Sequence, residues 1–356
     1  MMVYNYAIIG CGAITRRGHL PAIKKIEEIN AVAVSDINIK NARKVAKEFH
    51  IPRYYKDYRE MLKKEDIDVV IVATPTPTHF NIALDTIREG IHTIIEKPLS
   101  IHLNDAIKIV DASVENKVKV SVVQNYRYFP AALITKRNIE ENRLGKILSI
   151  VGCAHSTFPT TWTKGTWLYH EGGVLYDYFP HLVDLALWLL EFRKIKEVYA
   201  TGGDTLNAGF VNFSHVVINF EDGMYASLET SWLVGTMLLE IIVRGTGGWT
   251  YLDVRWDHVS EWHGVPTPID YTRDYMRRMI RVASYLFNKK FFTLPLLMLE
   301  NFHRDFISML NGKGGRNVAT ACQAAYVTGI LELALKSIKS KQAQKFPDEL
   351  NDLLVK

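Results

Sequence analysis

The chain has 356 residues, of which 48% are hydrophobic and 23% are charged, and both fractions are close to those of ordinary globular proteins. Its length is too great for one ordinary core and fits two domains, so the composition excludes a disordered tail or linker. The 43 basic and 38 acidic residues leave a formal charge of +5 without any basic run, which argues against a nucleic-acid partner.

Short apolar runs alternate with helical patterns through the first third of the chain. Strands of this length separated by helices are typical of βαβ units, which build a parallel sheet with helices on both faces. We therefore predict that residues 1–125 form an α/β domain around a doubly wound parallel sheet. The expected strands are 3–10, 31–36, 68–74, 92–96 and 117–123, separated by a helix ending near residue 28 and by helices through 42–49, 81–90 and 105–113.

The pattern changes after Tyr126. A helix is predicted over about 130–143, then longer strand-like runs with polar alternation, a helix around 177–191 and further helices near the C-terminus. Consecutive strands with short turns such as 221–223 indicate a mostly antiparallel sheet. Residues 126–356 are therefore predicted to form an α+β domain with a large open sheet. Its expected strands are 147–158, 197–203, 211–220, 225–233 and 238–246.

The segment GCGAIT at 10–15 follows the first predicted strand and opens a helix. Gly10 permits a tight turn, and Gly12 lets the backbone approach a pyrophosphate at the helix N-terminus, where Ala13 and Ile14 lie. Thr15 stands where a third glycine or an alanine is usual, and we expect it to loosen the packing of the helix on the strand. The alternative is that the two glycines merely form a turn.

Asp36 ends the second predicted strand, where an acidic side chain accepts hydrogen bonds from an adenosine ribose. An acid repels a 2′-phosphate, and Ile37 and Asn38 offer no cation to hold one. NAD is therefore preferred over NADP, and residues 1–125 are predicted to be a Rossmann domain that binds NAD(P). The alternative for Asp36 is that it caps the next helix.

The segment ATPTPTH at 73–79 ends a strand at the same edge of the sheet, where ligands of doubly wound folds bind. Its polar side chains face the cofactor or cap the following helix, and both interpretations stay open. Four residues of this loop are candidate cofactor contacts: Thr74, Pro75, Thr76 and His79.

The segment TIIEKPLS at 93–100 places Glu96 and Lys97 at the end of an apolar strand, followed by Pro98. Charged groups are rarely buried unless they are paired. A lysine at the carboxyl end of a parallel strand lies at the ligand crevice, and partial desolvation favours its neutral form. The alternative is that Glu96 and Lys97 form a surface ion pair.

The segment GGVLYDYFPHLVD at 172–184 predicts a helix that begins near Asp177 with Pro180 in its first turn. Asp177 and His181 are four residues apart and project from one face. Removal of a hydride from a carbinol carbon requires a base for the hydroxyl proton, and histidine titrates near neutral pH. The alternative is a capping aspartate and a core histidine. A metal site is not expected, because one histidine with Asp177 and Asp184 lacks the usual zinc ligands.

These motifs, in this order, resemble the glucose–fructose oxidoreductase, inositol dehydrogenase and MocA family of NAD(P)-dependent oxidoreductases, and the resemblance covers nearly the whole chain. It implies that Lys97 is catalytic and reaches the substrate oxygen, and that Glu96 helps to hold the cofactor. The segment QNYRYFPA at 124–131 resembles the family's domain junction, which makes Asn125 a further cofactor candidate. Phe179 and Glu171 depart from the family pattern, so no single relative's substrate is carried over.

Several polar and aromatic residues suit a sugar ring, which has apolar faces and a belt of hydroxyls. Arg127 and Trp167 are the two candidates selected as substrate contacts. The others are His155, Trp162, Lys164 and His170.

Together these features predict an NAD-dependent oxidoreductase that transfers a hydride between nicotinamide and a secondary alcohol or ketone of a sugar, cyclitol or nucleotide sugar. Lys97, Asp177 and His181 are the expected catalytic residues, and either Lys97 or His181 is the base. Two alternatives remain within the family: a dinucleotide-binding sugar sensor without turnover, and a glycosidase that oxidises its substrate transiently.

Cys11, Cys153 and Cys322 are widely separated and suit a reducing compartment, so a cytoplasmic protein is expected. The N-terminus lacks the basic and long apolar regions of a signal peptide, and the apolar stretch at 291–300 is too short to span a bilayer. We expect a small carbohydrate-like substrate and no membrane partner. Antiparallel open sheets leave one face to cover, so a homodimer or homotetramer is also expected.

Overall fold

The computed structural model describes residues 2–158, 173–288 and 290–353. The chain divides into two compact units. The first contains Met1–Asn125 and Thr293–Thr328, and the second contains Tyr126–Phe292 and Gly329–Lys356. The sequence analysis assigns every residue after 125 to the second domain, whereas the structure packs 293–328 with the first unit.

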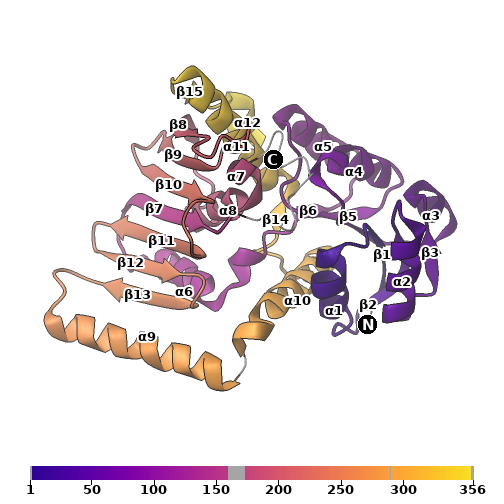
Figure 1. Ribbon diagram of the computed structural model, residues 1–356, viewed down its shortest axis with the longest axis horizontal. Helices are drawn as coiled ribbons and strands as arrows, with labels where there is room; N and C mark the ends of the chain where they lie inside the picture. The colour runs from indigo at the N-terminus through magenta and orange to yellow at the C-terminus, as the bar shows by residue number, and fades with distance from the viewer. Residues whose placement is uncertain (1, 159–172, 289, 354–356) are drawn as a thin grey trace. The chain divides into compact units, whose positions relative to one another are not determined.

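A seven-stranded sheet forms the centre of the first unit, in the order β14-β6-β5-β4-β1-β2-β3 (Figure 1). Every pairing is parallel except that of β14 with β6, which is antiparallel. All four residues of β4 are buried, as expected of a central strand covered by helices on both faces. The strands are β1 (Tyr4–Ile9), β2 (Ile29–Ser35), β3 (Arg53–Tyr55), β4 (Val69–Val72), β5 (His92–Ile95), β6 (Val120–Val122) and β14 (Ala319–Thr320).

Helices connect these strands as the βαβ pattern predicts. The sequence analysis missed β3 and the helix α3, because both are short and largely polar. The helical segments are η1 (Thr15–His19), α1 (Leu20–Ile23), α2 (Ile39–Phe49), α3 (Tyr58–Lys64), η2 (Thr76–Thr78), α4 (His79–Arg88), α5 (Leu103–Glu115) and α10 (Lys290–Leu310).

The turn between β1 and η1 requires glycine at its first position. Gly10 has φ +99°, and a Cβ atom there would lie 2.4 Å from the carbonyl oxygen of Ala73. The buried Thr15 hydroxyl donates a 2.6 Å hydrogen bond to the carbonyl oxygen of Gly10. The expectation that Thr15 loosens this region is therefore wrong, since its side chain closes the turn.

The helix α10 packs beside α1 in the first unit (Figure 1). Gly18 makes this approach possible, because a Cβ atom there would lie 2.8 Å from Cδ1 of Leu299. Met298, Leu299 and Phe302 are buried. The apolar stretch at 291–300 thus contributes to a core. Within the described residues, no helix combines the length and hydropathy needed to cross a bilayer.

The second unit is built on an eight-stranded sheet in the order β13-β12-β11-β7-β10-β9-β8-β15. Its pairings are antiparallel except that of β7 with β10. The strands β12 and β13 extend the sheet beyond those predicted. The strands are β7 (Ile147–His155), β8 (Ile195–Gly203), β9 (Phe213–Phe220), β10 (Tyr225–Ser231), β11 (Leu238–Gly245), β12 (Gly248–Asp253), β13 (His258–Trp262) and β15 (Gln344–Lys345).

One face of this sheet is covered by α8, in which all residues from Phe179 to Leu189 are buried. On the other side, Leu148, Tyr199 and Tyr225 are more than 40% exposed. The helix α9 extends along the β13 edge (Figure 1). The helical segments are η3 (Asn125–Tyr128), α6 (Pro130–Glu140), α7 (Gly173–Asp177), α8 (Phe179–Leu189), α9 (Pro268–Asn288), α11 (Ala321–Ser340) and α12 (Asp348–Leu353).

Replacement of Gly10 by alanine is predicted to destabilise the first unit, because the new Cβ atom meets the Ala73 carbonyl and the backbone is left-handed. We expect a loss of about 2–4 kcal/mol in the free energy of unfolding, measured in urea. Gly12→Ala is the matched control, since nothing lies within 4 Å of a Cβ atom there, and it should cost less than about 1 kcal/mol. Equal losses for the two variants would contradict this account.

Candidate active site

The glycine turn borders a cavity of about 230 Å³ in the first unit. Gly12 and Ala13 are exposed there, and the open space around Gly12 leaves room for a ligand to approach the backbone. Ile14 is 41% exposed on the first helical turn. These features fit the pyrophosphate of a dinucleotide, as the glycine motif predicts. The cavity is lined by Cys11, Gly12, Ala13, Arg16, Arg17, Asn41, Lys44 and Val45.

Asp36 is fastened to the glycine turn. Its carboxylate accepts a 2.9 Å hydrogen bond from the backbone N–H of Cys11 and a 2.8 Å hydrogen bond from that of Asn38. The N-cap of α2 is Asn38, whose side chain accepts from Lys40, so the capping alternative for Asp36 does not hold. The half-buried carboxylate lies at the carboxyl end of β2, where a ribose binds in doubly wound folds.

The sequence analysis missed three cations that line the cavity at the glycine turn. Arg16, Arg17 and Lys44 all line the cavity at the glycine turn, and Arg16 also pairs with Glu48 at 2.7 Å. They come from the helices on either side of β2. None of the three directly follows Asp36 in the sequence, where a cation that binds a 2′-phosphate is expected.

The loop after β4 is joined to the loop after β5 through His79. The buried ring has Nε2 2.8 Å from the carbonyl oxygen of Thr74 and Nδ1 2.9 Å from that of Pro98. Burial lowers the pKa of His79, whereas the two carbonyl oxygens raise it, because only a ring protonated on both nitrogens donates to both. These contacts give His79 a structural role in joining two loops, and its contact with the cofactor stays a prediction.

The other predicted residues of this loop differ in their exposure. Thr74 is half-buried, Pro75 is exposed and Thr76 is buried. The hydroxyl of Thr78 donates to that of Thr74 at 2.8 Å, which fixes the side chain of Thr74 at the carboxyl edge of the sheet. Asn125, the last residue of the first unit's N-terminal segment, is half-buried.

Glu96 and Lys97 follow β5 at the same edge, and both are half-buried. The Lys97–Pro98 peptide bond is cis. Glu96 does more than pair with its neighbour, because its Oε1 lies 2.9 Å from Nε2 of His19 and its Oε2 accepts a 3.2 Å hydrogen bond from the Lys97 backbone. His19 in turn contacts His303. Neither histidine was identified from the sequence.

In the second unit, Asp177 and His181 are surrounded by aromatic side chains. The ring of Tyr126 stacks on that of His181, with centroids 4.3 Å apart and an interplanar angle of 11°. Tyr126 and Tyr178 are joined by a side-chain hydrogen bond, and burial holds the pKa of Tyr126 well above its usual value. The indole N–H of Trp232 donates a 3.3 Å hydrogen bond to Asp177.

Asp177 and His181 lie on two separate helices and not on the single predicted helix. Asp177 ends α7 instead of starting a helix, and Tyr178 separates it from α8. Pro180 lies in the first turn of α8, where a missing N–H costs little. Phe179, which departs from the family pattern, is fully buried.

Arg127, which is predicted to contact substrate, forms a buried ion pair in the structure. Its side chain is fully buried, with Nε 2.8 Å and Nη2 2.6 Å from the two carboxylate oxygens of Asp184. Its guanidinium also lies 5.3 Å from the ring centre of Phe192. A buried, bidentate guanidinium of this kind anchors η3 to α8. This ion pair gives Asp184 a structural role.

Of the remaining substrate candidates, only His155 lies within the described residues. Trp167, the second selected contact, lies outside the described residues, as do Trp162, Lys164, His170 and Glu171. His155 is described, and its Nε2 lies 3.0 Å from Oε1 of Glu229.

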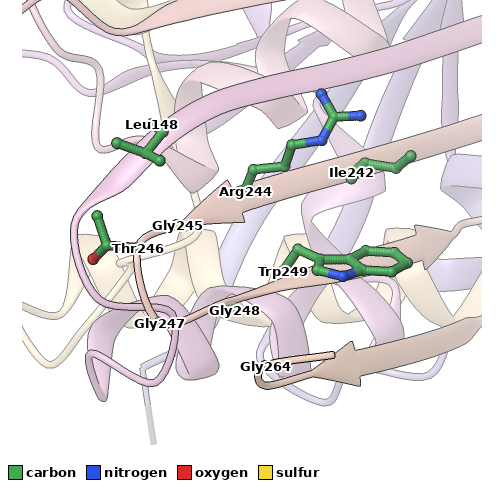
Figure 2. Close-up of a pocket in the computed structure, with 9 residues that line it drawn as sticks. All are labelled: Leu148, Ile242, Arg244, Gly245, Thr246, Gly247, Gly248, Trp249 and Gly264. Atoms are coloured by element: carbon green, nitrogen blue, oxygen red, sulfur yellow. The ribbon is translucent and has the colours of Figure 1, made fainter. Parts of the chain in front are cut away.

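A second cavity, of about 520 Å³, lies at the hairpin between β11 and β12 (Figure 2). Arg244 and Trp249 extend from these neighbouring strands, and Leu148 belongs to β7 (Figure 2). None of the predicted catalytic residues is among those that line it. It is lined by Leu148, Ile242, Arg244, Gly245, Thr246, Gly247, Gly248, Trp249 and Gly264.

A parallel sheet with a glycine turn after β1, an acid after β2 and ligand space at the turn defines a dinucleotide-binding fold. Comparison with protein families also indicates a dinucleotide-binding fold. Residues 4–124 match the model of an oxidoreductase family with an NAD-binding Rossmann fold, and residues 133–251 match the model of the C-terminal domain of the same family. The chain belongs to the glucose–fructose oxidoreductase, inositol dehydrogenase and MocA family.

Curated relatives include dehydrogenases of sugars and of inositols. The chain is 30% identical to a levoglucosan dehydrogenase of Pseudarthrobacter phenanthrenivorans over 47% of this chain and 45% of the relative. It is 27% identical to a D-apiose dehydrogenase of Paraburkholderia graminis, over 67% and 65% of the two chains. The matching region thus spans about half to two thirds of these relatives.

Solved structures share the fold over nearly the whole chain. A WlbA dehydrogenase from Bordetella pertussis, determined with NADH and UDP-GlcNAcA, superposes with a TM-score of 0.82 at 20% identity and covers 97% of this chain and 98% of its own. A levoglucosan dehydrogenase in complex with NADH and levoglucosan gives a TM-score of 0.80 at 18% identity, over 97% and 100% of the two chains.

Replacement of Arg127 by methionine is predicted to lower the free energy of unfolding by about 3–5 kcal/mol, because it leaves the buried Asp184 carboxylate without its partner. The double variant Arg127→Met/Asp184→Leu should lose less than the single variant, since it removes both charges. Urea unfolding measures both values. An Arg127→Met protein with unchanged stability would contradict the anchoring role.

Proposed function

We propose that this protein is an NAD-dependent oxidoreductase that transfers a hydride between nicotinamide and a secondary alcohol or ketone of a sugar, cyclitol or nucleotide sugar. The observation that carries the proposal is the Glu96–Lys97 pair at the carboxyl end of β5, on the same sheet edge as the glycine turn. Family membership and the activities named for the relatives support it. The bound cofactor would supply the hydride acceptor or donor.

Lys97 is the residue we assign to the substrate oxygen in the first unit. Its half-buried position at the ligand edge of a parallel sheet suits a cation that orients and polarises a hydroxyl or carbonyl. Glu96 is assigned to the cofactor side, because its carboxylate is fixed at the same edge by His19 and by the Lys97 backbone.

His181 is the residue we assign to proton exchange with the substrate hydroxyl in the second unit. Its ring orientation is set by the stacked Tyr126. Asp177 positions the substrate and the imidazole, and Trp232 holds its carboxylate by a hydrogen bond. In this assignment Lys97 orients the substrate oxygen and His181 exchanges its proton.

NAD is the preferred cofactor in this proposal. The Asp36 carboxylate stays at the end of β2 through two backbone hydrogen bonds, and its charge opposes a 2′-phosphate. Arg16, Arg17 and Lys44 act in the opposite direction, since they line the neighbouring cavity. We assign the preference to Asp36 because its carboxylate is tied to the backbone of the turn itself.

The open face of the second sheet is the surface we assign to self-association, as a homodimer or homotetramer. Its exposed Leu148, Tyr199 and Tyr225 are apolar or aromatic and lie on strands.

Lys97→Met and His181→Phe should each lower kcat by roughly 100- to 10,000-fold, as expected when a group that transfers or orients a proton is removed. The measurement is NADH formation at saturating NAD with the substrate that the wild-type protein oxidises. Lys63→Met and His215→Phe are matched controls, because both residues are exposed on other surfaces of their units. Unchanged turnover in Lys97→Met with cofactor still bound would refute the assignment of Lys97.

Asp36→Ser is predicted to shift cofactor preference toward NADP, because it removes the charge that opposes the 2′-phosphate and leaves the three cations in place. We expect the ratio of kcat/KM for NAD to that for NADP to fall by at least roughly tenfold. A wild-type protein that uses NADP better than NAD would overturn the stated preference.

A further inference from the structure

Three side chains from distant parts of the chain form a line of hydrogen bonds in the first unit. Oε1 of Glu96 lies 2.9 Å from Nε2 of His19, and Nδ1 of His19 lies 3.0 Å from Nε2 of His303. The residues come from the end of β5, the end of η1 and the middle of α10. Both histidines are fully buried, while the Glu96 side chain is 14% exposed. One end of this line is therefore internal and the other reaches the sheet edge.

The contacts define one neutral arrangement of the two rings. The Glu96 carboxylate can only accept, so Nε2 of His19 carries a proton and its Nδ1 accepts. Nε2 of His303 then carries the proton that is donated to His19, which leaves Nδ1 of His303 unprotonated. That atom is buried and has no hydrogen-bond partner among the described residues. An unprotonated nitrogen suits such a position better than a charged N–H, which would be left without an acceptor.

Electrostatics favour the same arrangement. Burial, with a smaller contribution from His19, holds the pKa of His303 well below its usual value, so its ring is neutral. Burial alone would raise the pKa of Glu96, but the hydrogen bond from His19, together with the charge of Lys97, lowers it below the usual value. The line therefore ends in an ionised carboxylate.

The carboxylate at the end of this line of hydrogen bonds lies where a ligand is expected to bind. Glu96 follows β5, and ligands of doubly wound sheets bind outside the carboxyl ends of the strands. One oxygen is held by His19 and the other also accepts from the Lys97 backbone, so the carboxylate has a fixed orientation. The ring of Tyr6 meets His303 edge-on at 6.0 Å between centroids and restricts the inner end.

We propose that His19 and His303 are positioning residues that hold the ionised Glu96 carboxylate against the nicotinamide ring of a bound dinucleotide. The inference rests on the proposed function for the identity of the ligand. His303 acts entirely through His19. Without His303, Nδ1 of His19 loses its donor, its proton is free to move between the two ring nitrogens, and Glu96 loses the donor that fixes it.

Calorimetric binding of NAD⁺ and of ADP-ribose to His303→Leu tests this proposal. ADP-ribose contains the adenosine and pyrophosphate but lacks the nicotinamide ring. We expect the dissociation constant for NAD⁺ to rise roughly tenfold, the lower range for losing a hydrogen bond to a charged group, while that for ADP-ribose changes by less than about twofold. His303→Gln retains an N–H donor and should restore NAD⁺ binding to within about threefold of the wild type.

Phe306→Leu is the matched packing control, because it alters a fully buried ring on the same helix that, unlike the ring of Phe302, forms no ring contact with His303 among the described residues. It should leave the ratio of the two dissociation constants unchanged. An unchanged ratio in a folded His303→Leu protein would overturn the positioning role and leave the proposed function standing. If the wild-type protein binds neither ligand, the proposed function fails, and this inference fails with it.

Nuclear magnetic resonance of ¹⁵N-labelled histidine in the wild-type protein provides a readout that does not depend on any variant folding. Both rings should carry their proton on Nε2 at neutral pH, and His303 should stay neutral because burial lowers its pKa. Signals are assigned with His19→Gln and His303→Gln. A protonated His303 imidazolium at neutral pH would overturn the proposal.

Discussion

Polar groups buried at the ends of buried strands need hydrogen-bond partners, and this constraint organises both units. In the first unit the parallel strands end at one edge. Asp36, His79 and Glu96 lie at this edge, and each has polar atoms that need hydrogen-bond partners. Each contacts a partner from another segment. Asp36 accepts from a backbone amide of the glycine turn, His79 contacts the carbonyls of two loops, and Glu96 contacts the first of two paired histidines. The loops at this edge are therefore fixed relative to one another.

Ligand binding and hydride transfer both depend on groups that are held in place before the ligand arrives. The fixed loops at the carboxyl edge of the sheet meet this requirement. Gly10 and Thr15 close the first turn, while His79 joins the second and third loops. In the second unit, the buried ion pair of Arg127 and Asp184 anchors η3, which carries the Tyr126 ring that stacks on His181. Residues that do not touch substrate thus control those assigned to it.

The sequence was sufficient for features that arise from local patterns. The βαβ alternation, the glycine turn, the acid after β2 and the charged pair after β5 are each contained in a few consecutive residues, and each appears where it was expected. The mostly antiparallel second sheet also follows from strand alternation. The short polar β3 and α3 were missed because neither has a clear apolar period.

Features that arise from long-range contacts could not be predicted in the same way. His19 and His303 are 284 residues apart, and neither belongs to a pattern that specifies the other. Arg127 was a reasonable substrate candidate by residue type, yet its partner Asp184 is 57 residues away. The packing of 293–328 with the first unit has the same origin, since the apolar face of α10 gives no indication of which core it joins.

The measurement that tests the central claim most directly is the absorbance of NADH when the purified wild-type protein is mixed with NAD and a panel of free sugars, cyclitols and UDP-sugars. The account predicts NADH formation with one of these classes, at a higher rate with NAD than with NADP. Silence across the panel in both reaction directions, in a protein that binds NAD tightly, would contradict an oxidoreductase and favour a sensor. Sugar release that requires NAD without net NADH would instead identify a redox-neutral glycosidase.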